Sequence, residues 1–227
     1  MSKAVIYEGL EGEFEGDEEV TDVTVFDSVA AITEIKDGAF CGCKGLTNLS
    51  FLKGSSITTF GDDAFAESGI ITLQGMEGVS KIGWDAFGDC KDLRTIEGLS
   101  CEEMGATCFE ECSRLQSMKG WPASMTVIPI GTFWNCSGMT TVDCDLSHVT
   151  SIEDDGINPQ AFCGCDSLLP DSLSEWDADP AAVLAYLKRK SKDERVLARY
   201  AGVRPGEASP DMNRLILEFK LSVFVQR

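Results

Sequence analysis

The chain has 227 residues, of which 43% are hydrophobic, and this is enough to fill the core of one or two domains. It carries 38 acidic and 19 basic residues, a net charge of -19, so it would repel a phosphate backbone. No apolar run fits a signal peptide or a membrane span. We therefore expect a cytoplasmic protein with free thiols and with neither a nucleic-acid nor a membrane partner.

The N-terminal segment "AVIYEGLEGEF" is predicted to form a hairpin cap over residues 1–19. In this hairpin Val5 and Tyr7 would alternate against Leu10 and Phe14. Acidic residues run along the segment and would discourage strand addition at this end.

Residues 20–170 contain an internal repeat in which each copy is anchored by a phenylalanine. Successive anchors lie 22 to 29 residues apart, a period that indicates a solenoid. Each copy has too few apolar residues to close a core alone, so the copies must stack. The segment "VTDVTVFDSV" matches the strand half of a copy and is predicted to belong to an earlier, incomplete repeat. The anchors are Phe40, Phe65, Phe87, Phe109, Phe133 and Phe162.

Other positions keep a fixed spacing from each anchor. Apolar residues stand five positions before it: Ile35, Phe60, Ile82, Met104, Ile128 and Ile157. A small residue stands three positions after it: Cys43, Ser68, Cys90, Cys112, Cys136 and Cys165. Apolar residues stand six positions after it: Leu46, Ile71, Leu93, Leu115, Met139 and Leu168. We expect the phenylalanine to fill the interior of a coil and the cysteine to pack where consecutive coils meet.

The copy "VSKIGWDAFGDCKDLRTI" resembles the BspA-type leucine-rich repeat, and the resemblance covers roughly residues 20–170 in six copies. It implies an α/β solenoid of parallel strands, about six repeats of 22–29 residues, with one short strand in each copy. It also implies a binding or adhesion scaffold with diverse partners. Some copies depart from the pattern at Ser68, Cys108, Pro129 and Thr132.

Residues 171–227 form a different module, predicted to be a helical cap or tail. Residues 1–170 hold nine Lys/Arg and 29 Asp/Glu, whereas the tail holds ten and nine. Asp179 before Pro180 predicts a helix start, followed by an apolar stripe of Val183, Leu184 and Leu187. Ser191–Glu194 is a capping box that predicts a second helix, and Ser209 with Pro210 predicts a third. The final segment "LSVFVQR" could instead form a strand.

The cysteines are predicted to be structural, with no metal and no other cofactor. The C-x-C pairs Cys41/Cys43 and Cys163/Cys165 leave a metal or redox site as the alternative, but five of the ten cysteines share one repeat position. An acidic group is predicted to be a solvated loop, with a calcium site as the alternative: Asp143, Asp145, Glu153, Asp154 and Asp155.

Two further motifs have a bland and a functional interpretation. His148 is the single histidine and is predicted to lie in a loop, and no phosphate loop or nucleophile elbow occurs, so we expect no enzyme. The basic run "KRKSK", Lys188–Lys192, is predicted to be a solvated helix face, with a nuclear import signal or a kinase site at Ser191 as alternatives.

The resemblance places the partner-binding site on the strand-lined surface, with a merely solvated sheet face as the alternative. Its outward positions are Asp22, Thr24, Asn48, Ser50, Thr72, Gln74, Thr95, Glu97, Ser117, Lys119, Thr141 and Asp143. Trp84 and Trp134 replace small or polar residues of the repeat, and exposed tryptophans are typical binding anchors.

The leading hypothesis is a protein-interaction scaffold whose partner has basic character, since opposite charge raises the association rate. The alternative is a surface or adhesion protein whose export signal is absent from this chain. An enzyme built on His148 is the third class.

Overall fold

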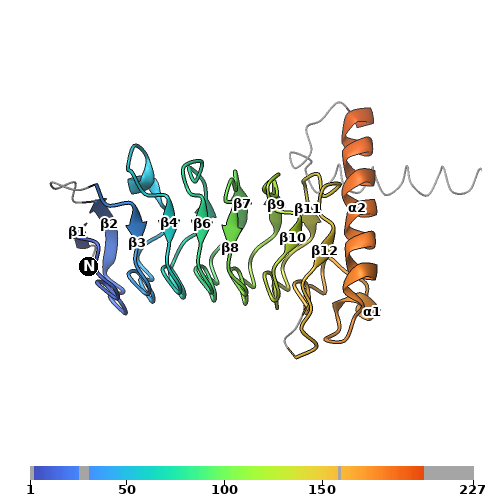
Figure 1. Ribbon diagram of the computed structural model, residues 1–227, viewed down its shortest axis with the longest axis horizontal. Coiled ribbons are helices and arrows are strands. Elements are labelled where there is room, and N and C mark those ends of the chain that lie inside the picture. Colours follow the sequence, from blue (N-terminus) through green and yellow to red (C-terminus); the bar gives the residue numbers. More distant parts are fainter. Residues whose placement is uncertain (1–2, 26–30, 158–159, 202–227) are drawn as a thin grey trace, which may run out of the picture.

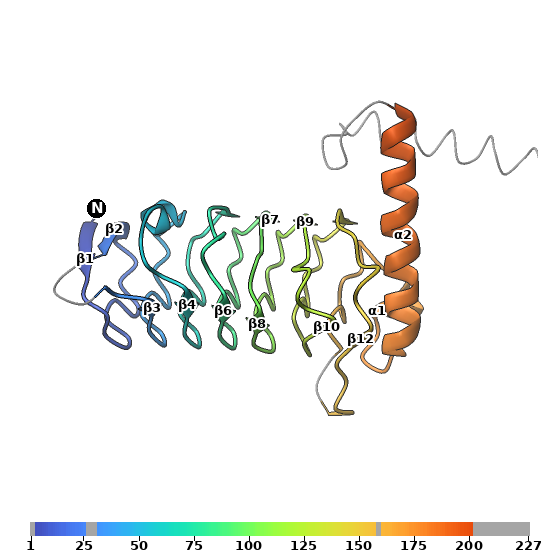
Figure 2. The same ribbon diagram turned by 45° about the horizontal axis from the view of Figure 1, so that its top comes forward.

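The computed structural model describes residues 3–25, 31–157 and 160–201, with residues 192–201 described by their backbone alone. The coils stack along one axis, and a long helix crosses the C-terminal end of the stack (Figures 1 and 2). The strands are β1 Lys3–Tyr7, β2 Val20–Val25, β3 Glu34–Ile35, β4 Thr59–Phe60, β5 Thr72–Leu73, β6 Lys81–Ile82, β7 Thr95–Glu97, β8 Glu103–Met104, β9 Ser117–Lys119, β10 Val127–Ile128, β11 Thr141–Val142 and β12 Ser151–Ile152. The helices are the 3-10 helix η1 Ser50–Leu52, α1 Asp171–Ser174 and α2 Pro180–Ala201.

All strand pairs are parallel, as expected for a leucine-rich repeat solenoid, but a typical coil contributes two strands instead of the one predicted. The strands preceding the phenylalanine turns form the sheet β3-β4-β6-β8 and the pair β10-β12. The strands following the turns form the sheet β5-β7-β9-β11. Each residue therefore pairs with its counterpart in the next coil, so each template position forms a row along the stack.

A column of phenylalanine rings runs through the interior, as predicted. Successive rings are stacked with centroids 5.2 to 5.7 Å apart and planes within 6° to 29° of each other. The six predicted anchors are fully buried. Stacked aromatic pairs contribute about 0.5–1.5 kcal/mol each beyond the area they bury, so the column ties every coil to its neighbours.

The repeated cysteine is more than a filler, because its thiol donates a hydrogen bond to the preceding coil. The acceptor is in each case the carbonyl oxygen of the preceding anchor phenylalanine, at 3.1 to 3.3 Å; the pairs are Cys43–Phe14, Cys90–Phe65, Cys112–Phe87, Cys136–Phe109 and Cys165–Phe133. Burial raises the pKa of these thiols, so they stay protonated. None of the ten cysteines, all of which lie in the described residues, forms a disulfide.

Two predicted interior positions are wrong. Ile71 is 39% exposed and Ile70 is buried in its place, because this copy is one residue shorter between its turn and its strand. Ile157 is 75% exposed, and Ile152 instead pairs with Ile128. The chain between Ile152 and Phe162 carries an insertion, so the interior isoleucine stands ten positions before the anchor instead of five.

The N-terminal hairpin is also wrong, because β1 pairs in parallel with β2. Phe14 stacks on Phe40 and is the anchor of a further coil at this end. The sequence carried a signal for this coil: Gly12 and Gly16 flank Phe14 as Gly38 and Gly42 flank Phe40, and all four have left-handed φ angles between 55° and 73°. The hairpin failed because the alternation of apolar residues does not distinguish a returning strand from a coil.

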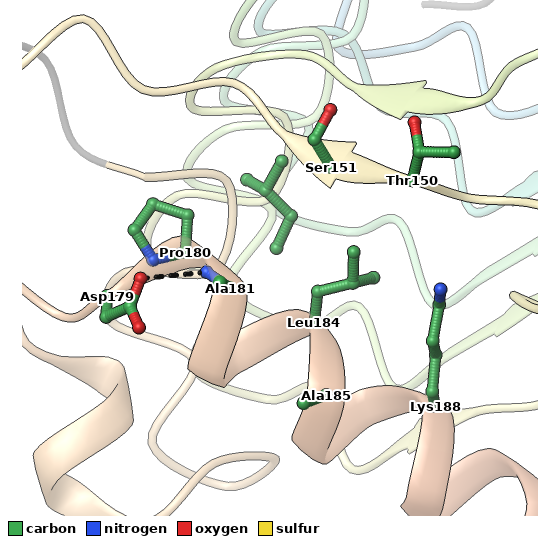
Figure 3. Close-up of a pocket in the computed structure, with 9 residues that line it drawn as sticks. Thr150, Ser151, Asp179, Pro180, Ala181, Leu184, Ala185 and Lys188 are labelled. Carbon is green, nitrogen blue, oxygen red and sulfur yellow. Dashed lines mark hydrogen bonds between the residues drawn. The ribbon is translucent and has the colours of Figure 1, made fainter.

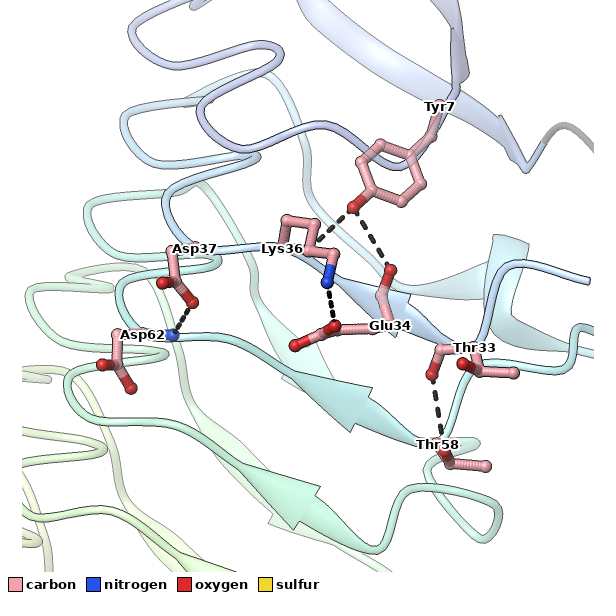
Figure 4. Close-up of polar contacts among 7 residues, drawn as sticks. All are labelled: Tyr7, Thr33, Glu34, Lys36, Asp37, Thr58 and Asp62. Carbon is pink, nitrogen blue, oxygen red and sulfur yellow. Dashed lines mark hydrogen bonds and ion pairs between the residues drawn. The ribbon is translucent and has the colours of Figure 1, made fainter.

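Tyr7 closes the open edge of the first long sheet. Its hydroxyl accepts a hydrogen bond from the Lys36 N–H at 2.7 Å and donates one to the Glu34 carbonyl at 3.2 Å (Figure 4). These are backbone groups on β3 and directly after it, at the edge where β3 has no strand partner among the described residues. Burial raises the pKa of Tyr7 to about 12, so the hydroxyl keeps its proton. One side chain thus replaces the missing strand.

Helix α2 covers the last coil. It runs unbroken from Pro180 to Ala201, so the predicted second helix start at Ser191 is wrong, whereas the Asp179 cap is present, with Oδ1 accepting the Ala181 N–H at 3.0 Å. Val183, Leu184 and Leu187 are buried as predicted. The starts predicted at Ser209 and in "LSVFVQR" lie outside the described residues.

The basic run of α2 is not the solvated face that was expected. Lys188 donates to the Val149 carbonyl, and Lys190 donates to the Thr140 and Leu168 carbonyls at 3.1 and 3.0 Å. The buried Ser191 hydroxyl donates to the Cys144 carbonyl. Amphipathic pattern alone could not show this, because the acceptors are backbone groups of distant residues. How the chain divides into domains stays a prediction.

Replacing Cys136 with alanine tests the thiol ladder, by which we mean the hydrogen bonds from the repeated cysteines to the phenylalanine carbonyls of the preceding coils. The change leaves the Phe109 carbonyl without its donor and opens a small cavity, so we expect the free energy of unfolding to fall by about 1–2 kcal/mol. Urea unfolding followed by circular dichroism measures it. Cys41→Ala removes a thiol that is only partly buried, and should change stability by less than about 0.5 kcal/mol. Equal losses in the two variants would show that a thiol at the repeated position contributes no more to stability than the thiol of Cys41.

Replacing Tyr7 with phenylalanine tests the edge cap. Two partly buried backbone groups lose their partner while the ring stays, so we expect a loss of about 1–2 kcal/mol and faster hydrogen exchange at the Lys36 amide. Tyr186→Phe is the control, since Tyr186 is partly buried on α2 and its ring contact with Arg189 survives the change. If Lys36 exchanged at the wild-type rate in Tyr7→Phe, the cap would have no energetic role.

Candidate protein-binding surfaces

The sheet β5-β7-β9-β11 presents the best-ordered part of the predicted binding surface, here called the strand face. The inward residues Leu73, Ile96, Met118 and Val142 are buried, so their neighbours along each strand must point outward. One outward row consists of Thr72, Thr95, Ser117 and Thr141, which pair in register. All four are partly exposed. The result is a row of four hydroxyl groups at the spacing of the coils.

A second outward row holds Gln74, Glu97, Lys119 and Asp143. Glu97 and Lys119 pair in register and form an ion pair at 2.6 Å, with about a third of each side chain exposed. Such a pair contributes about 0–1 kcal/mol to stability. The strand face is therefore polar and mixed in charge at its centre, which suits hydrogen-bonding contacts better than apolar burial.

Four of the predicted residues lie apart from this face. Ser50 begins η1, and Asn48 precedes it and accepts the Ser50 N–H with its side chain at 2.9 Å, so neither lies in a strand. Phe40 and Phe65 are separated by 25 residues, and the additional residues are accommodated around η1. Asp22 and Thr24 lie in β2, which pairs with β1 only. The strand face thus contains eight of the twelve predicted strand positions.

Neither tryptophan lies on the strand face. Trp84 is 64% exposed at the start of the turn after β6, where its backbone N–H donates to the Asp62 carboxylate at 2.8 Å. Trp134 lies in a turn and packs edge to face against Trp176, with ring centroids 6.4 Å apart. Of these two tryptophans, Trp84 is thus the exposed one, and Trp134 is partly covered by Trp176 in the segment between α1 and α2.

The phenylalanine turns form a second polar surface that the sequence analysis did not single out. At the positions two before and two after the anchor, the central copies place acidic residues at positive φ, between 48° and 55°: Asp63, Glu67, Asp85, Asp89 and Glu111. Earlier copies have glycine there. Left-handed backbone costs a non-glycine residue about 1–2 kcal/mol. The repeated alternation of glycine with acids at fixed offsets was the signal that the sequence offered.

Carboxyl groups of these turns perturb one another. Burial raises the pKa of Glu110 to about 7, and like-charge repulsion from Asp85 and Asp89 adds to it. Burial likewise raises the pKa of Asp63 and of Asp85. The excess negative charge of the chain is thus concentrated partly on this surface.

The single histidine contacts the backbone of a neighbouring coil. His148 is partly buried, with its Nε2 atom 3.0 Å from the Pro122 carbonyl oxygen. Within the described residues, no group of three or more His, Cys, Asp or Glu side chains is arranged to hold a metal ion. No helix in the described ranges has the length and apolar character needed to cross a membrane.

A pocket of about 420 Å³ lies between β12 and the first turns of α2 (Figure 3). Ile152 and Leu184 supply apolar lining, and Thr150, Asp179 and Lys188 supply polar groups. Lys188 also donates to the Val149 carbonyl, and Asp179 caps the helix, so these polar groups already serve the docking of α2. The pocket is therefore explained by the packing of α2 against the last coil.

Replacing Glu110 with glutamine tests the electrostatics of the turns. A carboxyl whose pKa rises on folding from 4.5 to about 7 binds its proton more tightly in the folded state, so stability falls as pH rises through that window. We expect Glu110→Gln to flatten the fall in melting temperature between about pH 5 and about pH 8. Glu102→Gln, at an exposed position, is the control. Identical pH profiles for Glu110→Gln and wild type would show that Glu110 is not perturbed.

Known proteins share this fold at low sequence identity. A leucine-rich repeat protein from Bacteroides ovatus is 22% identical with a TM-score of 0.52, over 64% of this chain and 40% of that one. The chain thus spans less than half the length of that protein. A T. pallidum leucine-rich repeat protein is 19% identical with a TM-score of 0.58, over 82% of this chain and 83% of that one. These likenesses establish the fold alone. No match was found among curated proteins.

A family model describes most of the solenoid. The BspA type leucine-rich repeat region matches residues 11–140 and 69–174 with six copies. The match begins ahead of Phe14, in agreement with the additional coil at the N-terminal end. The chain therefore belongs to the BspA-type leucine-rich repeat family.

Proposed function

We propose that this chain is a protein-interaction scaffold that binds its partner on the strand face. The observation that carries the proposal is the register of β5, β7, β9 and β11, which aligns a row of hydroxyl groups across four coils and pairs Glu97 with Lys119 in the row beside it. A continuous polar surface at a fixed spacing suits many simultaneous hydrogen bonds to a partner.

Rigidity supports the same proposal. The phenylalanine column and the thiol ladder link each coil to the next, so the outward rows are held in place before a partner arrives. A preorganised surface loses less conformational entropy on binding than a flexible one. The short Thr and Ser side chains of the first row also lose little rotamer freedom when they are covered.

The partner is proposed to be basic. The net charge of -19 and the acidic turns would attract a positively charged protein over a distance and raise the association rate. The Glu97–Lys119 pair at the centre of the strand face then contributes specificity more than affinity, because a surface ion pair contributes little energy.

The combined change of Thr72, Thr95 and Thr141 to arginine tests the strand face. Three long cationic side chains would clash with a docked partner and repel a basic one, so we expect proteins captured from cell extract by the full chain to be depleted by about tenfold or more. Quantitative mass spectrometry measures the depletion.

The control places the same three charges on or directly beside strands that precede the phenylalanine turns. Thr59, Thr126 and Ser151 belong to strands β4 and β12 and to the segment before β10, and their change to arginine should leave capture unchanged. If the strand-face variant captured the same proteins as wild type, or if both variants lost them equally, the strand face would not be the binding site.

A further inference from the structure

The N-terminal end of the stack leaves one strand edge open among the described residues. β1 is five residues long and has β2 as its single strand partner. It lies at the extreme end of the stack (Figure 1), so its other edge points away from the coils. Two other edges of the stack are covered: the Tyr7 hydroxyl caps the edge of β3, and α2 covers the last coil.

The exposed side chains at this end include large apolar ones. Val5 and Tyr7 point into the core, whereas Ile6 on the same strand is 54% exposed and Leu10 just after it is 58% exposed. Large apolar side chains beside an unpaired edge are what natural proteins normally avoid, because such an edge pairs readily with another strand.

The charge around β1 indicates which strand would pair with it. Eight acidic residues lie between positions 8 and 22, and Lys3, the only cation in this part of the chain, is engaged in an ion pair with Asp17. A second copy of the chain would bring two such acidic ends together, which like-charge repulsion opposes. A strand with alternating basic and apolar residues is complementary on both counts.

We propose that the open edge of β1 binds an extended segment of a basic protein, which adds as a further strand to the β1-β2 pair. Backbone hydrogen bonds along β1 supply affinity, Ile6 and Leu10 contact the apolar residues of the added strand, and the acidic residues pair with its Lys or Arg. This surface is separate from the strand face and extends the proposed function by a second contact at the far end of the stack.

The test uses the full-length chain and the peptide acetyl-KVKVTVK-amide, labelled for fluorescence anisotropy. We expect saturable binding, and slower hydrogen exchange at the amides of β1 when the peptide is present. The control peptide acetyl-KVKPTVK-amide has the same charge but a proline that removes one N–H and interrupts the ladder. It should bind about tenfold more weakly. Equal affinity for the two peptides would mean attraction by charge alone and would overturn strand addition.

Variants locate the site. Ile6→Lys places a positive charge and a polar tip on the edge, and should weaken binding of the first peptide by about tenfold. Ile71→Lys is the matched control at an exposed isoleucine before β5, 39% exposed, and should bind as wild type does. Equal effects of the two changes, or exchange protection on β5–β11 in place of β1, would overturn the assignment.

Two further outcomes are decisive. The strand-face variant with three arginines should bind the peptide as well as wild type does, so that failure of the strand-face proposal and failure of this one can be told apart. Sedimentation velocity of the protein alone should show no association that Ile6→Lys abolishes. If it does, the occupant of the edge is a second copy of the chain, and the basic segment proposed here is wrong.

Discussion

The structure depends on one constraint: each coil must repeat the previous one at the spacing of a parallel sheet. Within that spacing, of about 4.8 Å, each coil contributes one anchor ring to the column, stacked at 5.2 to 5.7 Å on the next. The ring separation slightly exceeds the strand separation, as offset stacking allows. Every other repeated feature is arranged around this column.

The cysteines follow from the same constraint. Beside the ring column there is room for a small side chain, and the carbonyl of each anchor phenylalanine points toward it from the coil before. A thiol is small, apolar and still a weak donor, so it fills the space and satisfies the carbonyl. Ser68 departs from this pattern, and its hydroxyl instead lies 3.4 Å from the Cys90 sulfur.

A stack of coils leaves backbone groups without a strand partner at both ends, and in this protein side chains form hydrogen bonds to such groups. At one end a tyrosine hydroxyl replaces a strand, and at the other two lysines and a serine of α2 reach carbonyls of the last coil. The β1 edge is left outside this arrangement. An edge flanked by apolar and acidic side chains opposes pairing with a second acidic copy more than pairing with a basic strand, and the proposed strand addition rests on this difference.

The sequence by itself determined the parallel solenoid, its anchors and the position of most interior residues, because a fixed spacing of apolar residues has few other solutions. It also determined the outward rows of β5 to β11, since strand residues alternate strictly between two faces. Only the tertiary structure decided where the spacing between the anchor and the interior residue changes, at Ile71 and Ile157. A loop that is one residue shorter or five residues longer leaves the stacking of the coils unchanged, but it moves the interior residue to another position of the sequence template. The tertiary structure also decided that Asn48 and Ser50 leave the strand face. It further decided that the side chains of Tyr7, Lys188, Lys190 and Ser191 cap backbone groups. Such contacts join residues 22 to 50 positions apart, and no local pattern records them.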